Sequence, residues 1–382
     1  MFKKIQMGLR HQASGHHVCS PEAGQLFAEY VVQTRAILDH VRAGVNDAER
    51  IAEGNAPFEL CPSGDFPHGR DKQYKRGVLL THGLSDSPYH MRHLAAFFQR
   101  NGFRVMAILL PGHGTQPGDL LDVSWKDWAK TVAYGVDRLS EEVDEVYLAG
   151  FSAGAALSLH HASLDKRVSG LFLFSPALEI TSRAKWAWLH KLYSWMNPRA
   201  AWVSVMPDQD TYKYESFCKN AAAQMYALTK ALPQDAIQIP VFIAASADDA
   251  TVHPSATLRF IQRAQHPVST LVWYSTKRIT QSNVEWVDSA IPAQKILSSA
   301  HTAVVMPPED EHYGAEGEYK NCLHYHGSEE ERYVMCLKAK QDVSLGEVNE
   351  RNLQQGLLRR LTFNPHFAAM EASMQRFIKE IG

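Results

Sequence analysis

The sequence has no apolar run that approaches the roughly 20 residues of a membrane-spanning helix, so a transmembrane protein is not expected. An excess of charge of one sign is also missing, because 39 Lys and Arg stand against 41 Asp and Glu, for a formal net charge of −2. This balance gives no signal for a nucleic-acid partner or an anionic membrane surface. Internal repeats and low-complexity tracts are absent too.

Cysteine is scarce, with five residues in 382. Such sparse and odd-numbered use predicts mostly free thiols in a reducing compartment, although Cys322 and Cys336 lie close enough in sequence to pair if the protein is exported. The stretch Met1–Arg10 has a basic start but no sustained apolar run, which is a poor secretory signal. We therefore expect a cytoplasmic protein, and export remains the alternative if the N-terminus has been trimmed.

What the chain does contain is enough apolar sequence, 45% of its residues, for a large core. Residues 1–56 predict an N-terminal helical extension, because Phe27, Val31 and related apolar positions recur at helical spacing and Pro21 suits a helix start. We expect this extension to pack on the outside of the core.

From Phe58 onward, short apolar runs alternate with amphipathic helical stretches. This alternation predicts an α/β fold with a mostly parallel sheet and helices on both faces, over residues 57–178 and 236–382. Ligands of such sheets bind beyond the carboxyl ends of the strands. The expected strands are Phe58–Cys61, Gly77–Thr81, Phe103–Leu110, Val146–Ala149, Val168–Phe174, Ile239–Ala245, Leu271–Tyr274 and Ile296–Ser299, and the expected helices include Met91–Asn101, Trp125–Val143, Pro254–Arg263 and Phe367–Ile381.

Two segments interrupt the alternation. Residues 179–235 are rich in aromatics, and we interpret them as a helical cap inserted over the site, with some of its rings lining an apolar substrate pocket. Residues 307–365 form a polar stretch that we expect to be a long loop, and both Cys322 and Cys336 lie in it.

The strongest single motif is Gly150-Phe151-Ser152-Ala153-Gly154, a G-x-S-x-G sequence. It follows the apolar run Val146–Ala149 and opens into a helical pattern. Strand, sharp turn and helix are the setting of a nucleophile elbow, in which the turn exposes the serine hydroxyl at the carboxyl end of a strand. Ser152 is therefore the expected nucleophile, and a Gly/Ser-rich turn without chemistry is the alternative.

A serine hydroxyl needs a general base, usually His, and a carboxylate that orients this base. After a nucleophile elbow, the acid is expected before the histidine in the chain. Asp248 and Asp249 both follow an apolar strand, and we prefer Asp249 because Val252, three positions on, can anchor the turn.

The preferred base is His301, which directly follows the expected strand Ile296–Ser299. His253 lies too close to Asp249 to come from a separate loop, and His266 and His312 remain competitors.

Acyl transfer also needs donors for the oxyanion. The backbone N–H of Ala153 follows the nucleophile, and the pair His82-Gly83 ends the expected strand Gly77–Thr81 and would present the N–H of Leu84. We therefore expect Leu84 and Ala153 to form an oxyanion hole, with His82 and Gly83 supporting the loop.

The motifs GVLLTHGLSDSPYHMRHLAAFF, LLPGHGT, GFSAG and SADDATV, followed by a His after the last strand, resemble the α/β-hydrolase superfamily. The resemblance covers about Phe58 to His301 plus the closing helix, and it is to the carboxylesterase and monoacylglycerol-lipase branch, also called serine-aminopeptidase-like. It implies the catalytic set Ser152, Asp249 and His301, oxyanion donors at Leu84 and Ala153, and a helical cap. The departures are the N-terminal helices, the long spacing from Asp249 to His301, Ser246 where relatives often have Gly, and the segment from Pro307 to Pro365.

We therefore predict a serine hydrolase that cleaves carboxylic esters, with short or medium acyl groups or monoglycerides as substrates. A peptidase, amidase or thioesterase would share this machinery, and a non-catalytic binding protein of the same fold is the alternative from a different class. No cofactor and no metal are expected, although Cys322-Leu323-His324-Tyr325-His326 contains residue types that bind zinc. The expected partner is a small ester substrate, and the sequence gives no oligomeric state.

Overall fold

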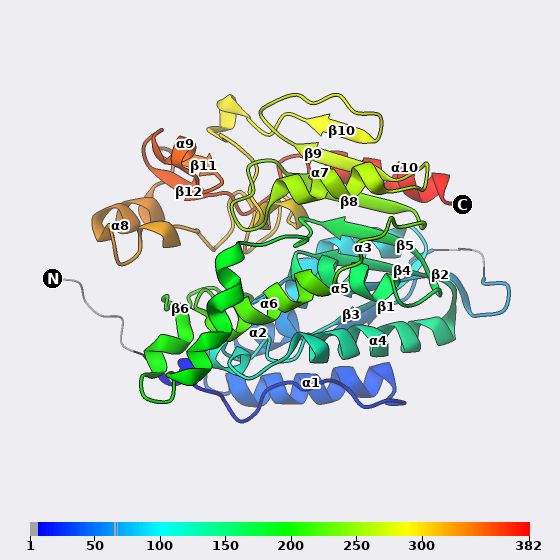
Figure 1. The fold of residues 1–382 in the computed structure, drawn as a ribbon, viewed down its shortest axis with the longest axis horizontal. Coiled ribbons are helices and arrows are strands. Elements are labelled where there is room, and N and C mark those ends of the chain that lie inside the picture. The colour runs from blue at the N-terminus through cyan, green and yellow to red at the C-terminus, as the bar shows by residue number, and fades with distance from the viewer. Residues whose placement is uncertain (1–6, 65, 67) are drawn as a thin grey trace. The chain divides into compact units, whose positions relative to one another are not determined.

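A computed structural model of the chain describes residues 7–64, 66 and 68–382 (Figure 1). Backbone contacts group the chain into two compact units. The larger unit comprises Gln6–Phe172 and Ile180–Asp235, and the smaller unit comprises Leu173–Glu179 and Ala236–Gly382. Strand β5 (Val168–Phe174) begins in the larger unit and ends in the smaller one.

The larger unit contains a sheet in which the strand order is β1-β3-β2-β4-β5. The central strand β2 runs parallel to both β3 and β4, and only the short β1 is antiparallel to its neighbour. Thr81 at the end of β2 lies opposite Gly150 near the end of β4, so the loops that follow these two strands start side by side. The strands are β1 (Phe58–Leu60), β2 (Tyr74–Thr81), β3 (Phe103–Ile108) and β4 (Val143–Phe151).

Helices pack on this sheet as the alternation in the sequence predicts. Phe98 of α3 contacts Phe103 of β3 and Phe172 of β5, and α4 and α5 pack on β2 and β4. The helices are α3 (Arg92–Arg100), preceded by η2 (Pro88–Met91), then η3 (Pro117–Leu120), α4 (Trp125–Glu142) and α5 (Ala153–Ala162). In the part of the chain that the structure describes, no helix is both long and apolar enough to cross a membrane.

Within the described residues of the N-terminal extension, α-helix begins only at Phe27. The prediction of a helix start at Pro21 is wrong, because α1 begins at Phe27 and Gly24 has φ +88°, which an α-helix does not accommodate. The extension belongs to the larger unit and packs at its edge, where Phe27 and Tyr30 contact Tyr134 of α4 (Figure 1). Its elements are η1 (Leu9–His11), α1 (Phe27–Arg42) and α2 (Ala48–Asn55).

Residues 179–235 are less helical than the sequence suggests. Their aromatic side chains divide into a buried group that includes Trp202 and Tyr214, and an exposed group that includes Trp186, Trp188 and Trp195. The elements are η4 (Ser182–Leu192), η5 (Pro198–Ala201), β6 (Trp202–Ser204), β7 (Phe217–Cys218) and α6 (Lys219–Ala231).

The smaller unit contains three parallel strands in the order β8-β9-β10. In Figure 1, α7 lies in front of these strands and α10 behind them, with Phe377 of α10 against Phe242 of β8. The elements are β8 (Val241–Ser246), α7 (Pro254–Arg263), β9 (Thr270–Tyr274), β10 (Val284–Val287), η6 (Pro292–Gln294), η7 (Thr302–Val305) and α10 (Phe367–Glu380).

The expected strand at Ile296–Ser299 is wrong. The last strand of this sheet is β10, whereas Ile296 forms only isolated bridges, with Ile291 and with Leu345. The backbone N–H of Leu297 donates to the carbonyl of Leu345, so this stretch is paired with a later segment instead of with the sheet. A short apolar run does not reveal which partner satisfies its backbone.

The segment at 307–365 is structured, which corrects the prediction of a long loop. It contains η8 (Leu323–Tyr325), α8 (Glu330–Lys338), β11 (Ser344–Gly346), α9 (Glu350–Leu353) and β12 (Leu358–Arg360). Cys322 and Cys336 form a disulfide that packs with Tyr325 and Tyr333 in a small buried cluster. A crosslink of this kind compensates for a short apolar core.

Candidate active site

Ser152 lies at the sharp turn between β4 and α5, as the sequence predicts. Its backbone has φ 53° and ψ −110°, a conformation that L-residues rarely adopt. A Cβ at Gly150 would lie 2.3 Å from the backbone of Gly154, and a Cβ at Gly154 would lie 2.0 Å from the carbonyl oxygen of Thr81. Only glycine fits at both positions, so the motif is required by the close approach of β2, β4 and α5.

The next residue, Ala153, is the first residue of α5. The first N–H groups of a helix have no partner within the helix, and they lie at the positive end of its dipole. The geometry is therefore suited to stabilising negative charge beside the Ser152 hydroxyl.

His82 fixes the peptide that carries the second expected donor. Its Nε2 accepts a hydrogen bond from the N–H of Leu110 at 3.0 Å, so Nδ1 carries the proton and donates to the carbonyl of Gly83 at 2.8 Å. In a trans peptide, the N–H of Leu84 points away from the Gly83 carbonyl. His82 thereby determines which way the Leu84 N–H faces.

An ion pair that the sequence does not reveal holds the same loop. Asp86 is 1% exposed and pairs with Lys213 from the segment 179–235, and the N–H of Tyr214 donates to the carbonyl of Ser85 at 2.8 Å. Burial alone would raise the pKa of Asp86, but Lys213 and His90 together bring that pKa below its usual value. No sequence signal links Asp86 to Lys213, because 127 residues separate them.

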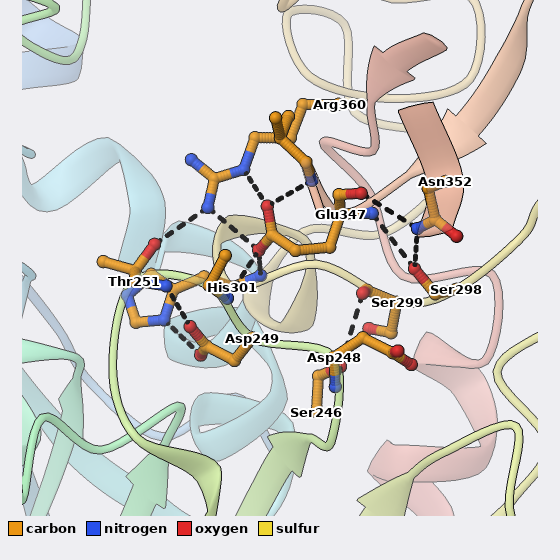
Figure 2. Close-up of polar contacts among 12 residues, drawn as sticks. Ser246, Asp248, Asp249, Thr251, Ser298, Ser299, His301, Glu347, Asn352 and Arg360 are labelled. Atoms are coloured by element: carbon orange, nitrogen blue, oxygen red, sulfur yellow. Dashed lines mark hydrogen bonds and ion pairs between the residues drawn. The ribbon is translucent and has the colours of Figure 1, made fainter. Parts of the chain in front are cut away.

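The smaller unit brings Asp249 and His301 together. Asp249 follows β8, His301 precedes η7, and His301 Nδ1 lies 2.5 Å from Asp249 Oδ2 (Figure 2). The other carboxylate oxygen accepts the N–H groups of Thr251 at 2.8 Å and Val252 at 3.0 Å. Although burial raises the pKa of Asp249, the opposing effects of His301 and of these two N–H groups lower it overall. An ionised carboxylate on Nδ1 leaves Nε2 of His301 as the nitrogen that can act as a base.

Two of the competing side chains, Asp248 and His312, pair with other residues. Asp248 pairs with Arg351 at 2.7 Å, and burial raises the pKa of its carboxyl group despite this contact. His253 precedes α7 and donates its backbone N–H to Glu179, and His312 lies 3.5 Å from Glu318.

The residues proposed as a zinc alternative do not form a metal centre. Cys322 is bonded to Cys336 and therefore supplies no thiolate. Within the described residues, no group of three or more His, Cys, Asp or Glu side chains is arranged to hold a metal ion.

Because the side chains of His82 and His113 are buried, we expect the protein to lose stability in mild acid. Burial lowers the pKa of His113 to about 4, and burial together with neighbouring His113 lowers that of His82 well below its usual value. The unfolded chain therefore binds protons below about pH 6.5 that the folded protein does not bind, so the free energy of unfolding falls from pH 6.5 towards pH 4 by about 1.4 kcal/mol per pH unit for each histidine.

Urea denaturation at pH 7 and pH 5 checks this expectation. In wild type, the free energy of unfolding should be lower at pH 5 than at pH 7. This difference should be smaller in His113→Gln and unchanged in His17→Gln, where the replaced side chain is exposed. An equal pH difference in wild type and His113→Gln would contradict the prediction.

Sequence comparisons connect this geometry to known proteins. The chain is 32% identical over 108 residues to a thermostable monoacylglycerol lipase of Bacillus sp. (strain H-257), a match that covers 28% of this chain and 43% of that protein. It is 32% identical over 85 residues to a carboxylesterase of Bacillus subtilis (strain 168), covering 22% and 35% respectively. The chain thus spans less than half the length of either relative.

Among solved structures, one of the metagenome-derived lipolytic enzymes LipS and LipT is 24% identical, with a TM-score of 0.47, and covers 58% of this chain and 87% of that one. The monoacylglycerol lipase of Paleococcus ferrophilus is 19% identical, with a TM-score of 0.42, over 53% of this chain and 86% of that one. The family described as serine aminopeptidase, S33, matches residues 72–278, more than half of the chain. With this match and its mostly parallel sheet, the chain belongs to the serine aminopeptidase S33 family and has an α/β-hydrolase fold.

Proposed function

We propose that the protein is a serine hydrolase that cleaves carboxylic esters through an acyl-enzyme intermediate. The observation that carries the proposal is the strained conformation of Ser152 at a strand–helix turn, together with the buried pair Asp249–His301. The names of the two Bacillus relatives, a monoacylglycerol lipase and a carboxylesterase, favour an ester over an amide.

In this mechanism the Ser152 hydroxyl attacks the ester carbonyl and transfers its proton to Nε2 of His301. The ionised Asp249 stabilises the imidazolium through Nδ1. The N–H groups of Leu84 and Ala153 stabilise the oxyanion, and His82 and Gly83 hold the first of these donors in place. His301 then protonates the departing alcohol, and a water molecule releases the acid in a second round of the same steps.

We further propose that residues 57–178 and 236–382 form the catalytic core and that 179–235 form a cap that selects the acyl group. Several large apolar side chains of this cap are exposed, with Trp195 at 77% and Met196 at 66%. Contact with apolar parts of a substrate would remove such surface from water. Esters with short or medium acyl chains and monoglycerides are therefore the proposed substrates.

The disulfide bears on location. Structural disulfides persist mainly in oxidising compartments. The bond between Cys322 and Cys336 therefore supports export over the cytoplasmic location that composition suggests.

A substrate panel tests the reaction type. We expect kcat/KM to be highest for p-nitrophenyl esters from acetate to a medium-chain acid, and for a short monoacylglycerol. Values should be much lower for p-nitroanilides and thioesters of the same acyl groups. An anilide turned over faster than the ester of the same acyl group would instead assign the protein to amide hydrolysis.

A further inference from the structure

A buried carboxylate from the segment at 307–365 contacts the loops of both Asp249 and His301. Glu347 is 0% exposed and directly follows β11. Its Oε2 accepts the backbone N–H of His301 at 3.0 Å (Figure 2). The same oxygen lies 3.5 Å from the backbone nitrogen of Ala250, the residue after Asp249. One oxygen atom therefore faces backbone groups on either side of the Asp249–His301 hydrogen bond.

Arg360 on β12 neutralises this carboxylate. Its Nη2 donates to Oε2 of Glu347 at 2.9 Å, and its Nε lies 2.7 Å from Oε1 as an ion pair. Burial on its own would lower the pKa of Arg360, but Glu347 outweighs this effect and raises it. The same Nη2 donates to Thr251 Oγ1 at 2.8 Å, which places the guanidinium on the Asp249 loop as well.

The segment that carries the ion pair is fixed to the backbone that precedes His301. Ser298 Oγ accepts the N–H of Glu347 at 3.1 Å and Nδ2 of Asn352 at 2.9 Å, and that Nδ2 also donates to the carbonyl of Glu347. On the other side, the disulfide region supports β12, because Arg359 donates to the carbonyls of Cys336 and Ala339 at the end of α8. The Glu347–Arg360 ion pair is thus held by the two short parallel strands of the segment, β11 and β12.

We propose that Glu347, held by Arg360, is a positioning residue that sets the geometry of the Asp249–His301 pair. This inference rests on the proposed function, and it adds a requirement for a segment outside the matched family region of residues 72–278. A base displaced by even 1 Å can lose about 100-fold in rate, so small shifts of the His301 backbone matter for catalysis.

The simpler alternative is that the ion pair only stabilises the fold. A purely structural role would lower the amount of folded protein without changing turnover per folded molecule. A positioning role would lower kcat per active site and leave KM nearly unchanged, because Glu347 is not expected to touch substrate.

The test is the nearly isosteric variant Glu347→Gln. Its amide replaces one of the two acceptor oxygens with an NH2 donor and removes the negative charge that pairs with Arg360, so either the N–H of His301 or the Nε of Arg360 then faces a donor. We expect kcat per site, normalised by titration with a p-nitrophenyl phosphonate, to fall about 10- to 100-fold, with KM within about twofold of wild type. Arg360→Lys keeps the positive charge but loses the second nitrogen that faces the carboxylate, so its kcat per site should lie between the values of wild type and Glu347→Gln. Glu350→Gln, at an exposed position three residues along the same segment, is the matched control and should equal wild type.

A second measurement, proton NMR, reports on the Asp249–His301 hydrogen bond without relying on turnover. The proton on Nδ1 of His301 should give a downfield signal in the proton NMR spectrum, absent from Asp249→Asn. In Glu347→Gln this signal should shift or broaden, while in Glu350→Gln it should stay in place. An unchanged signal and an unchanged kcat per site in Glu347→Gln would overturn the positioning role. Hydrolysis that persists in Ser152→Ala would instead count against the proposed function, whatever the NMR result.

Discussion

Replacing Ser152 with alanine should reduce ester hydrolysis by roughly 10⁴–10⁶-fold, because no other group would form the acyl-enzyme. The fold should be retained, since alanine fills the same backbone position with one atom fewer. The measurement is kcat/KM on p-nitrophenyl butyrate, together with covalent labelling by a fluorophosphonate probe, which should modify wild type at Ser152 and leave Ser152→Ala unmodified.

The matched control is Ser158→Ala, which removes a buried hydroxyl six residues further along, in α5 itself. This variant should label and turn over like wild type. If Ser152→Ala retained more than a hundredth of wild-type activity, either another nucleophile or the non-catalytic alternative would have to be considered.

The second large effect is expected at the Asp249–His301 pair. His301→Ala should lower kcat/KM by about 10⁴-fold or more, and Asp249→Asn by about 10⁴-fold, because an amide no longer stabilises the imidazolium. A p-nitrophenolate leaving group needs no proton, so the loss would report mainly on activation of the nucleophile. Steady-state kinetics on the same p-nitrophenyl ester measure both variants.

Two neighbouring substitutions serve as controls for this prediction. Asp248→Asn removes the adjacent carboxylate, which pairs with Arg351, and His312→Gln removes a competing imidazole. Both should stay within a few-fold of wild type. Near-normal hydrolysis by His301→Ala would disprove the assignment of His301 as the base.

The sequence allowed correct prediction of those features that depend on local pattern. Strand β5 and helix α7 have the predicted bounds, Val168–Phe174 and Pro254–Arg263, because each is an apolar or amphipathic run with a clear start and end. The turn at Ser152 could also be predicted, because the backbone around it comes so close that only glycine fits at Gly150 and Gly154. The roles of Ser152, Asp249 and His301 in catalysis remain predictions.

The features that were missed depend on contacts between distant residues. Glu347 is a charged residue in a polar stretch, and such residues are usually exposed. It is buried here because Arg360 neutralises it and because backbone groups 46 residues and 97 residues earlier in the chain donate to it. The strand wrongly expected at Ile296–Ser299 has the same cause, because its backbone pairs with Leu345. Local patterns contain no information about partners at these separations.

The link from Glu347 to the backbone of His301 has a practical consequence for trimming the protein. A shortened version that ended after η7 would keep the serine, the aspartate and the histidine, and would look complete by its motifs. It would nevertheless lack Glu347, so the backbone N–H groups of Ala250 and His301 would lose their carboxylate acceptor and face water. Minimal versions for biotechnology should therefore be cut at other places and retain the disulfide-linked region.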